Sequence, residues 1–210
     1  MQPLLSSKKI IAVLILEDPK RAVDTARALQ AGGIGAIELT LRTDSALESL
    51  RRIRAEVPEL LVGAGTVLTP AQLKDAKKAG AQFAVAPGCN PRVIAAARDE
   101  GIFFAPGVMT PSDIEIALEN GCRLLKFFPA ATSGGLKHLE AMGAPYKHLG
   151  VSYIPLGGVT PENLAEMLAH PMVACVGGSW LAKPDQIAAG AYDQIRELAA
   201  QASAIAKRGK

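Results

Sequence analysis

The sequence predicts an α/β protein whose strands and helices alternate around a (β/α)8 TIM barrel. Short apolar runs, typical of buried parallel strands, alternate with longer segments of helical period along the whole chain. Residue pairs that start helices and glycines that end them recur between these runs. Because no linker or low-complexity tract interrupts the alternation, we expect a single domain over residues 1–210.

Eight apolar runs are candidate strands. They are residues 10–16, 36–39, 61–64, 83–86, 103–106, 124–127, 153–156 and 173–176. Eight repeats in 210 residues leave about 26 residues for each, which is compact but sufficient for a barrel. An open doubly wound sheet is the rival architecture. It normally carries a GxGxxG motif after its first strand, whereas residues 14–20 contain no glycine.

The segments between these runs carry signals for helix boundaries. A capping side chain precedes a proline at four predicted helix starts: Thr69-Pro70, Asn90-Pro91, Thr110-Pro111 and Thr160-Pro161. Glycines stand at four predicted helix ends: Gly32, Gly80, Gly101 and Gly121. The last helix is expected over residues 185–205, where it would close the ring.

Composition excludes several classes of protein. Apolar residues make up 49% and charged residues 20% of the chain, which excludes intrinsic disorder. With 4% aromatic residues and a net charge of +3, the chain is not typical of nucleic-acid-binding proteins. The apolar run 10–16 is too short for a membrane span, and the acidic pair Glu17-Asp18 follows it where a signal peptide would have its cleavage site.

The cysteines and histidines predict neither disulfides nor a metal site. The three cysteines are widely spaced, so we expect a reduced, cytoplasmic protein: Cys89, Cys122 and Cys175. The three histidines show no HxH or HExxH spacing: His138, His148 and His170.

Lys126 interrupts an otherwise apolar strand. Lysine is rarely buried without a partner or a chemical role. Its side chain can extend past the strand end or pair with a carboxylate for structural reasons. The functional alternative is a Schiff-base nucleophile, because desolvation or a neighbouring cation favours the neutral amine that such chemistry needs.

Glu38 is the second polar residue in a predicted strand. Alternation places Glu38 and Thr40 on one face and Ile37 and Leu39 on the other. Because the more apolar set suits the helix-facing side, Glu38 is expected to point into the barrel mouth, where catalytic residues of such barrels lie. A salt bridge to Arg42 is the structural interpretation, and general acid/base catalysis is the functional one.

Glycine-rich loops follow three of the strands. Gly157-Gly158 follows the seventh strand, and Gly177-Gly178-Ser179 follows the eighth. Loops at these positions often bind phosphate, because glycines let backbone N–H groups approach an anion. Together the two loops predict a phosphorylated ligand. The turn Gly63-Ala64-Gly65-Thr66 offers N–H groups and a hydroxyl to a carboxylate.

Several of these residues belong to longer motifs in a fixed order. Over nearly its whole length the chain resembles the bacterial family of 2-keto-3-deoxy-6-phosphogluconate (KDPG) and 4-hydroxy-2-oxoglutarate aldolases, which are class I enzymes. The motifs that carry the resemblance are Glu38-Leu-Thr-Leu-Arg42-Thr, Val62-Gly-Ala-Gly-Thr66-Val-Leu, Ala86-Pro87-Gly88, Pro106-Gly-Val, Leu125-Lys126-Phe-Phe-Pro129-Ala, Gly157-Gly158-Val and Val176-Gly-Gly-Ser179-Trp.

The resemblance implies a homotrimer of (β/α)8 barrels that needs no metal or organic cofactor. It implies that Lys126 is the Schiff-base lysine and Glu38 the acid/base group. The substrate contacts that it implies are Arg42 and Thr66 for the carboxylate, Gly157, Gly158, Gly177, Gly178 and Ser179 for the phosphate, and Pro87, Phe128 and Leu156 elsewhere in the site. The implied reactions are cleavage of KDPG to pyruvate and glyceraldehyde 3-phosphate, and of 4-hydroxy-2-oxoglutarate to pyruvate and glyoxylate.

Leu156 departs from the pattern, because these enzymes commonly carry threonine before the Gly-Gly pair. The departure leaves the stereochemistry of the substrate open, so an aldolase for the galactonate-derived epimer is an alternative. A second alternative is a non-catalytic barrel that binds a phosphorylated ligand, since a fold does not by itself imply a function. The joint presence of Lys126, Glu38 and Arg42 argues against that second alternative.

Overall fold

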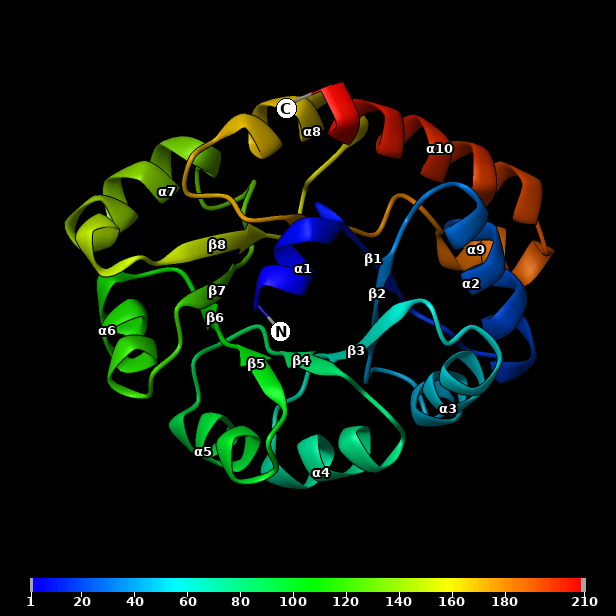
Figure 1. The fold of residues 1–210 in the computed structure, drawn as a ribbon, viewed down its shortest axis with the longest axis horizontal. Coiled ribbons are helices and arrows are strands. Elements are labelled where there is room, and N and C mark those ends of the chain that lie inside the picture. Colours follow the sequence, from blue (N-terminus) through cyan, green and yellow to red (C-terminus); the bar gives the residue numbers. More distant parts are fainter. Residues whose placement is uncertain (1, 209–210) are drawn as a thin grey trace.

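The computed structural model describes residues 2–208, which form the predicted (β/α)8 barrel (Figure 1). The strands are β1 Ile10–Leu14, β2 Ala36–Thr40, β3 Leu61–Gly65, β4 Phe83–Val85, β5 Phe103–Ala105, β6 Gly107–Val108, β7 Leu124–Phe127, β8 Ser152–Pro155 and β9 Val176–Gly178. All ladders between them are parallel, in the orders β5-β4-β3-β2-β1-β9 and β6-β7-β8.

Two short connections join these sheets into a ring. Pro106 lies between β5 and β6, so these two segments occupy the place of the fifth barrel strand. The Pro106 carbonyl accepts a 2.8 Å bond from the backbone N–H of Lys126 in β7. On the other side, Tyr153 of β8 pairs with Val173 just before β9, and Ala174 N donates to Tyr153 O at 2.9 Å.

Helices surround the strands on the outside of the ring (Figure 1). They are α2 Ala22–Ala31, α3 Ala46–Glu56, α4 Pro70–Lys78, α5 Pro91–Asp99, α6 Pro111–Glu119, α7 Gly135–Gly143, α8 Pro161–Ala169, α9 Pro184–Ala189 and α10 Tyr192–Arg208, with 3-10 turns at Pro19–Arg21 and Ala144–Leu149. A further helix, α1 Gln2–Lys8, precedes β1 and is not part of this outer ring. Within residues 2–208, no helix has the length and apolar character that crossing a membrane requires.

The predicted helix starts are confirmed. Thr69 and Thr110 form capping boxes on α4 and α6, and the Asn90 side chain accepts from Arg92 N at 3.0 Å on α5. Asn163 accepts from the Thr160 N–H at 2.9 Å at the start of α8. These bonds use N–H groups that a helix end leaves without a partner, so the local sequence suffices to mark the boundaries.

Three expectations need correction. The last strand is Val176–Gly178 rather than 173–176, because β1 pairs with the glycines themselves, Ile11 with Gly177 and Ala12 with Gly178. The segment predicted as one helix over 185–205 is two helices, α9 and α10, separated at Gly190, which adopts φ 67°. The N-terminal helix α1 was not predicted.

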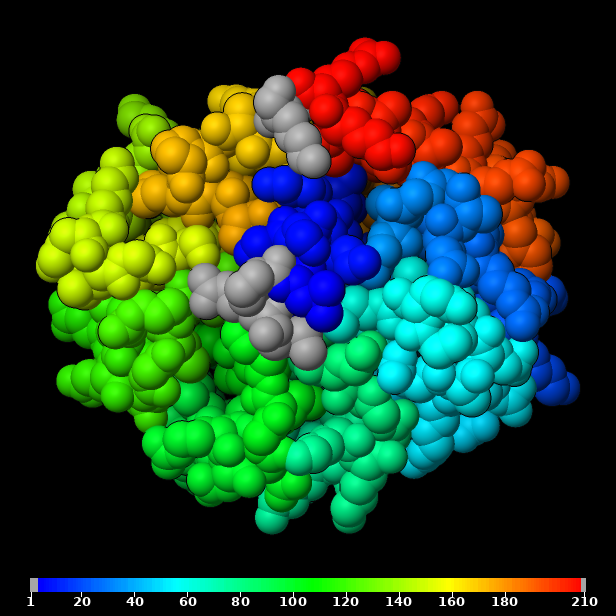
Figure 2. All heavy atoms as spheres, in the orientation of Figure 1, coloured from blue at the N-terminus to red at the C-terminus, as the bar shows by residue number. Residues whose placement is uncertain are grey.

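Helix α1 lies across the N-terminal end of the barrel. Its atoms occupy the centre of the face shown in Figure 2. Leu5 is completely buried and packs with residues of the barrel interior, among them Ile11 and Phe83. This interior cluster continues to Leu156 and Phe128. The barrel is therefore filled from its N-terminal end, which leaves its C-terminal end for a site.

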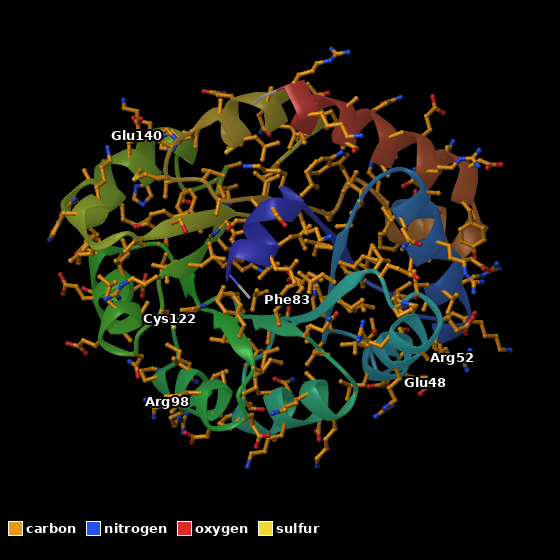
Figure 3. All side chains as sticks on the ribbon, in the orientation of Figure 1. Glu48, Arg52, Phe83, Arg98, Cys122 and Glu140 are labelled. Carbon is orange, nitrogen blue, oxygen red and sulfur yellow. The ribbon has the colours of Figure 1, made fainter. Side chains whose placement is uncertain are left out.

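A second, larger cluster lies between the strands and the outer helices. Ile37 and Leu39 belong to it, whereas Ala36 belongs to the interior cluster, so the predicted alternation in β2 is confirmed. Most charged residues lie at the surface, and Glu38 and Lys126 are the two that are buried among the residues whose burial the structure describes. In Figure 3, Glu48 and Arg52 of α3 lie at the periphery, where their side chains pair at 3.0 Å, while Phe83 lies near the centre.

Candidate active site

A cavity of about 190 Å³ lies at the C-terminal ends of the strands. Its lining residues are Val13, Ile15, Glu38, Thr40, Arg42, Thr66, Pro87, Lys126, Phe128, Leu156, Gly157, Gly177 and Ser179. These residues come from most strands of the ring, which is how active sites of such barrels are built. Ten of the twelve residues that sequence analysis singled out meet here, since all except Gly158 and Gly178 are in this lining.

Lys126 and Glu38 form the polar centre of this cavity. Lys126 Nζ donates to Glu38 Oε1 at 3.1 Å, and the two side chains are only 6% and 1% exposed. Lys126 comes from β7 and Glu38 from β2, so closure of the barrel is what brings them together. The structural alternative of a pair between Glu38 and Arg42 is wrong, because Glu38 pairs with Lys126.

The surrounding protein shields the charges of Lys126 and Glu38 from bulk water. Within residues 2–208 it adds no further charged partner to the pair. The Phe128 ring centroid lies 5.5 Å from Lys126 Nζ and presents an aromatic face to the amine. A proton moving across the 3.1 Å contact converts ammonium and carboxylate into amine and carboxylic acid. The pair thus places an amine within hydrogen-bond reach of a carboxylate, which is the geometry that nucleophilic catalysis by lysine needs.

Gly65 makes room for the Glu38 side chain. Gly65 ends β3 beside Thr40, and a β-carbon added to it would lie 2.6 Å from both Cγ and Cδ of Glu38. Any larger residue at this position would therefore displace the carboxylate from the lysine. Sequence analysis treated Gly65 as part of a ligand-binding turn, whereas its clearest structural role is to accommodate Glu38.

Arg42 and Thr66 lie at the mouth of the cavity, beyond the buried pair. The Arg42 side chain is exposed, and it forms no ion pair with any carboxylate within residues 2–208. Thr66 is half-buried and has φ 56°, a left-handed conformation that is uncommon for a β-branched residue. A guanidinium without a carboxylate partner beside a hydroxyl is suited to an anionic ligand.

The glycine loops form the other side of the mouth. Gly157 and Gly158 both have positive φ, 85° and 87°, which L side chains rarely adopt. Gly157, Gly177 and Ser179 line the cavity. Gly158 and Gly178 lie behind them. A β-carbon on Gly158 would meet Ala131, and the Trp180 ring occupies the space beside Gly178.

Sequence analysis missed three lining residues: Val13, Ile15 and Thr40. Val13 and Ile15 alternate along the first strand and its extension, but apolar residues at this position look like ordinary core. Thr40 had a usable signal, because it shares a strand face with Glu38. Its hydroxyl donates to Leu14 O at 3.1 Å.

The cysteines take no part in this cavity. Burial raises the pKa of the Cys175 thiol to about 12, and burial, followed by the nearby Asp113 charge, does the same for Cys89. Burial also raises the pKa of Cys122. In the part of the chain that the structure describes, no three His, Cys, Asp or Glu side chains are grouped so as to hold a metal ion.

Comparisons with known proteins agree on one family. The family model for KDPG and KHG aldolase matches residues 1–198. The KHG/KDPG aldolase of Escherichia coli strain K12 is 41% identical over 206 residues, which are 98% of this chain and 96% of that protein. The 2-dehydro-3-deoxy-phosphogluconate aldolase of Treponema pallidum strain Nichols is 45% identical over 197 residues, which are 94% and 93% of the two chains.

A solved structure leads to the same family. The crystal structure of KDPG aldolase from Legionella pneumophila, with pyruvate captured at low pH as a covalent carbinolamine intermediate, matches with a TM-score of 0.91. The two chains are 36% identical, and the match covers 95% of this chain and 97% of that one. By sequence and by structure, this chain belongs to the KDPG and KHG aldolase family, whose members are carbon–carbon lyases.

Proposed function

We propose that the chain is a class I aldolase that cleaves KDPG to pyruvate and glyceraldehyde 3-phosphate. The observation that carries this proposal is the buried 3.1 Å contact between Lys126 Nζ and Glu38 Oε1 at the C-terminal end of the barrel. The carbinolamine captured in the Legionella relative supports imine chemistry, because a carbinolamine is the adduct that precedes an imine.

The reaction begins with the free amine of Lys126. The amine adds to the C2 ketone of the substrate, the ketone oxygen takes up a proton, and loss of water leaves a protonated imine. Glu38 is the group in reach to accept and return the protons of these steps. The iminium carbon then serves as the electron sink for breaking the adjacent carbon–carbon bond.

Glu38 next removes the proton of the C4 hydroxyl. The C4 oxygen forms the carbonyl of the leaving aldehyde, and the electrons of the C3–C4 bond move into the imine to give an enamine. Protonation of the enamine at C3 and hydrolysis of the imine release pyruvate and the free lysine. Glu38 therefore acts as base in cleavage and as acid in product formation.

Five further lining residues bind the two ends of the substrate. Arg42 and Thr66 hold the C1 carboxylate, and Gly157, Gly177 and Ser179 hold the phosphate through N–H groups and a hydroxyl. 4-Hydroxy-2-oxoglutarate is a second substrate in this proposal, since it presents the same 2-keto acid to Lys126 and Arg42. The double name of the Escherichia coli relative supports it.

Leu156 leaves room for one further candidate substrate, the galactonate-derived epimer. It is almost completely buried and lies against Gly177, where a β-carbon would be 2.6 Å from Leu156 Cδ2. A leucine offers shape but no hydrogen bond to the C4 hydroxyl, so it gives the site little means of rejecting either epimer.

Reduction of the imine tests the proposed function. Borohydride added with pyruvate should attach a pyruvate-derived mass to one peptide that contains Lys126 and should abolish aldolase activity. The Lys126→Ala variant should take up no label and release no pyruvate from KDPG. Labelling at another lysine, or full activity of Lys126→Ala, would overturn the proposal.

The assembly and location stay predictions. We propose a single domain that forms a cytoplasmic homotrimer, as the family resemblance implies. Light scattering on the purified chain measures its mass in solution, and a monomeric mass would contradict the trimer.

A further inference from the structure

Three hydroxyl groups connect the end of β2 and the loop after it to the end of β1 and the residues that follow it. Thr40 Oγ1 donates to Leu14 O at 3.1 Å, and Thr43 Oγ1 donates to Leu16 O at 2.5 Å. Ser45 Oγ also donates to Leu16 O. We call Thr40, Thr43 and Ser45 the hydroxyl clamp. All three bonds run from side chain to backbone between segments that are 26 to 29 residues apart in sequence.

Ser45 occupies a position at which a serine side chain usually bonds the start of a helix. It is the residue before α3, a position at which a serine hydroxyl normally accepts from an N–H of the first helical turn. Here the hydroxyl makes no such capping bond and is directed to Leu16 O, within 3.2 Å of the Thr43 hydroxyl. The helix start therefore lacks a side-chain cap, while the loop gains a connection to the residues after β1.

Arg42 lies between the first and second members of the clamp. Its own N–H donates to Thr40 O at 2.8 Å, and the N–H of Leu41 donates to Gly65 O at 2.8 Å. The backbone on its N-terminal side is thus tied to β3, and the chain on its C-terminal side is tied to Leu16, just after β1, through the Thr43 hydroxyl. No ion pair within residues 2–208 holds the guanidinium, and these bonds fix the backbone from which the Arg42 side chain extends.

We propose that Thr43 and Ser45 are positioning residues, which fix Arg42 for the substrate carboxylate. The inference rests on the proposed function, in which Arg42 binds that carboxylate. A planar guanidinium recognises a carboxylate through two parallel bonds, and a loop displaced by about 1 Å loses that geometry. Lys126 and Glu38 belong to β7 and β2, so loosening the loop should weaken substrate binding and spare the chemical step.

The test compares Thr43→Val with the double variant Thr43→Val/Ser45→Ala. Valine keeps the shape of threonine and removes only the hydroxyl. We expect KM for KDPG and the inhibition constant of pyruvate to rise about fivefold to tenfold per lost bond, with kcat within about twofold of the wild type. Thr43→Ser, which keeps the hydroxyl, should restore both constants.

Thr25→Val is the matched control. Thr25 is completely buried and its hydroxyl donates to Arg21 O at 2.7 Å, but it lies in α2 and does not line the cavity. This variant loses the same kind of bond, and it should lower stability without changing KM. A rise in KM for Thr25→Val as large as that for Thr43→Val would mean that general destabilisation causes the effect, and would overturn the clamp.

The Arg42→Ala variant distinguishes failure of the hydroxyl clamp from failure of the proposed carboxylate role of Arg42. If Arg42 acts as proposed, Arg42→Ala weakens pyruvate binding, and adding Thr43→Val to it has no further effect on binding. If Arg42→Ala weakens binding but the clamp variants bind normally, only the clamp is wrong. If Arg42→Ala binds pyruvate as the wild type does, the carboxylate role of Arg42 fails, and the clamp fails with it.

Discussion

Lys126 Nζ lies 3.1 Å from Glu38 Oε1, although 88 residues separate the two in the chain. Burying either charged side chain alone at this depth in the barrel would cost desolvation free energy. The opposite charge of its partner offsets part of that cost. In the proposed function, the pair also holds one transferable proton between the amine and the carboxylate. The same contact would then explain both how the two groups are tolerated inside the barrel and how they react.

Glu38→Gln tests the proton-transfer role. Glutamine keeps the size and can still contact Lys126, but it cannot accept the proton of the C4 hydroxyl. We expect kcat for KDPG cleavage to fall about 10²-fold to 10⁴-fold while pyruvate affinity stays near that of the wild type. Steady-state kinetics and pyruvate inhibition measure the two effects separately. Near-normal turnover would exclude the role of Glu38.

Gly65→Ala tests whether the space beside Glu38 matters. The added β-carbon would lie 2.6 Å from Cγ and Cδ of Glu38, so the carboxylate must move away from Lys126. We expect kcat to fall about 100-fold or more, as for loss of the acid/base group. Gly88→Ala is the control, because a β-carbon there meets nothing within 4 Å. Equal activity of the two variants would contradict this role of Gly65.

Cys175 makes stability depend on alkaline pH. Burial raises the pKa of its thiol to about 12, whereas an unfolded thiol ionises near about 8.5. Below the lower value both states are protonated. Above it only the unfolded state gains by ionising, so the stability that the protonated thiol contributes is lost as pH rises from about 9 to about 12.

Cys175→Ala removes this dependence. The wild type should lose about 1.4 kcal/mol more unfolding free energy than the variant for each pH unit above about 9. Urea unfolding of both proteins at about pH 8, 9 and 10 measures the difference. Other buried thiols, such as Cys89, contribute equally to both proteins, so parallel loss of stability would show that Cys175 contributes nothing in this range.

The fold could be predicted from sequence wherever the deciding signals are local. Apolar runs, Thr-Pro helix starts and glycine helix ends can each be recognised within a few residues. Together they predicted the order of strands and helices. The prediction failed at β9, where Gly177 and Gly178 are strand residues only because β1 pairs with them. It also failed at α1, whose helical position is decided by burial of Leu5 in the barrel end.

The residues that form the site could be predicted from sequence, but the contacts between them could not. Lys126 and Glu38 were recognisable because each is a polar residue in a buried strand. Their pairing depends on β2 and β7 facing each other across the closed ring, which no local pattern specifies. The roles of Gly65 and of the hydroxyl clamp likewise depend on which atoms meet in three dimensions.

Leu156→Thr tests how the site selects between C4 epimers. Leu156 directly follows β8, lines the cavity and packs against Gly177 of β9. A threonine there would offer a hydroxyl to the substrate, and discrimination built on a hydrogen bond exceeds discrimination built on packing. The variant should shift the ratio of kcat/KM toward the gluconate-derived epimer by about 1–2 kcal/mol, the scale of one net hydrogen bond.

Leu156→Val is the control for this prediction, because valine has nearly the shape of threonine and no hydroxyl. Both variants shorten a buried side chain, so both should lose stability and open the same space beside Gly177. Only the threonine variant should change epimer preference, and kcat/KM for both epimers in all three proteins measures it. If the wild type already discriminates strongly, or if valine shifts the ratio as far as threonine does, selectivity resides in the shape of the cavity rather than in a hydrogen bond at this position.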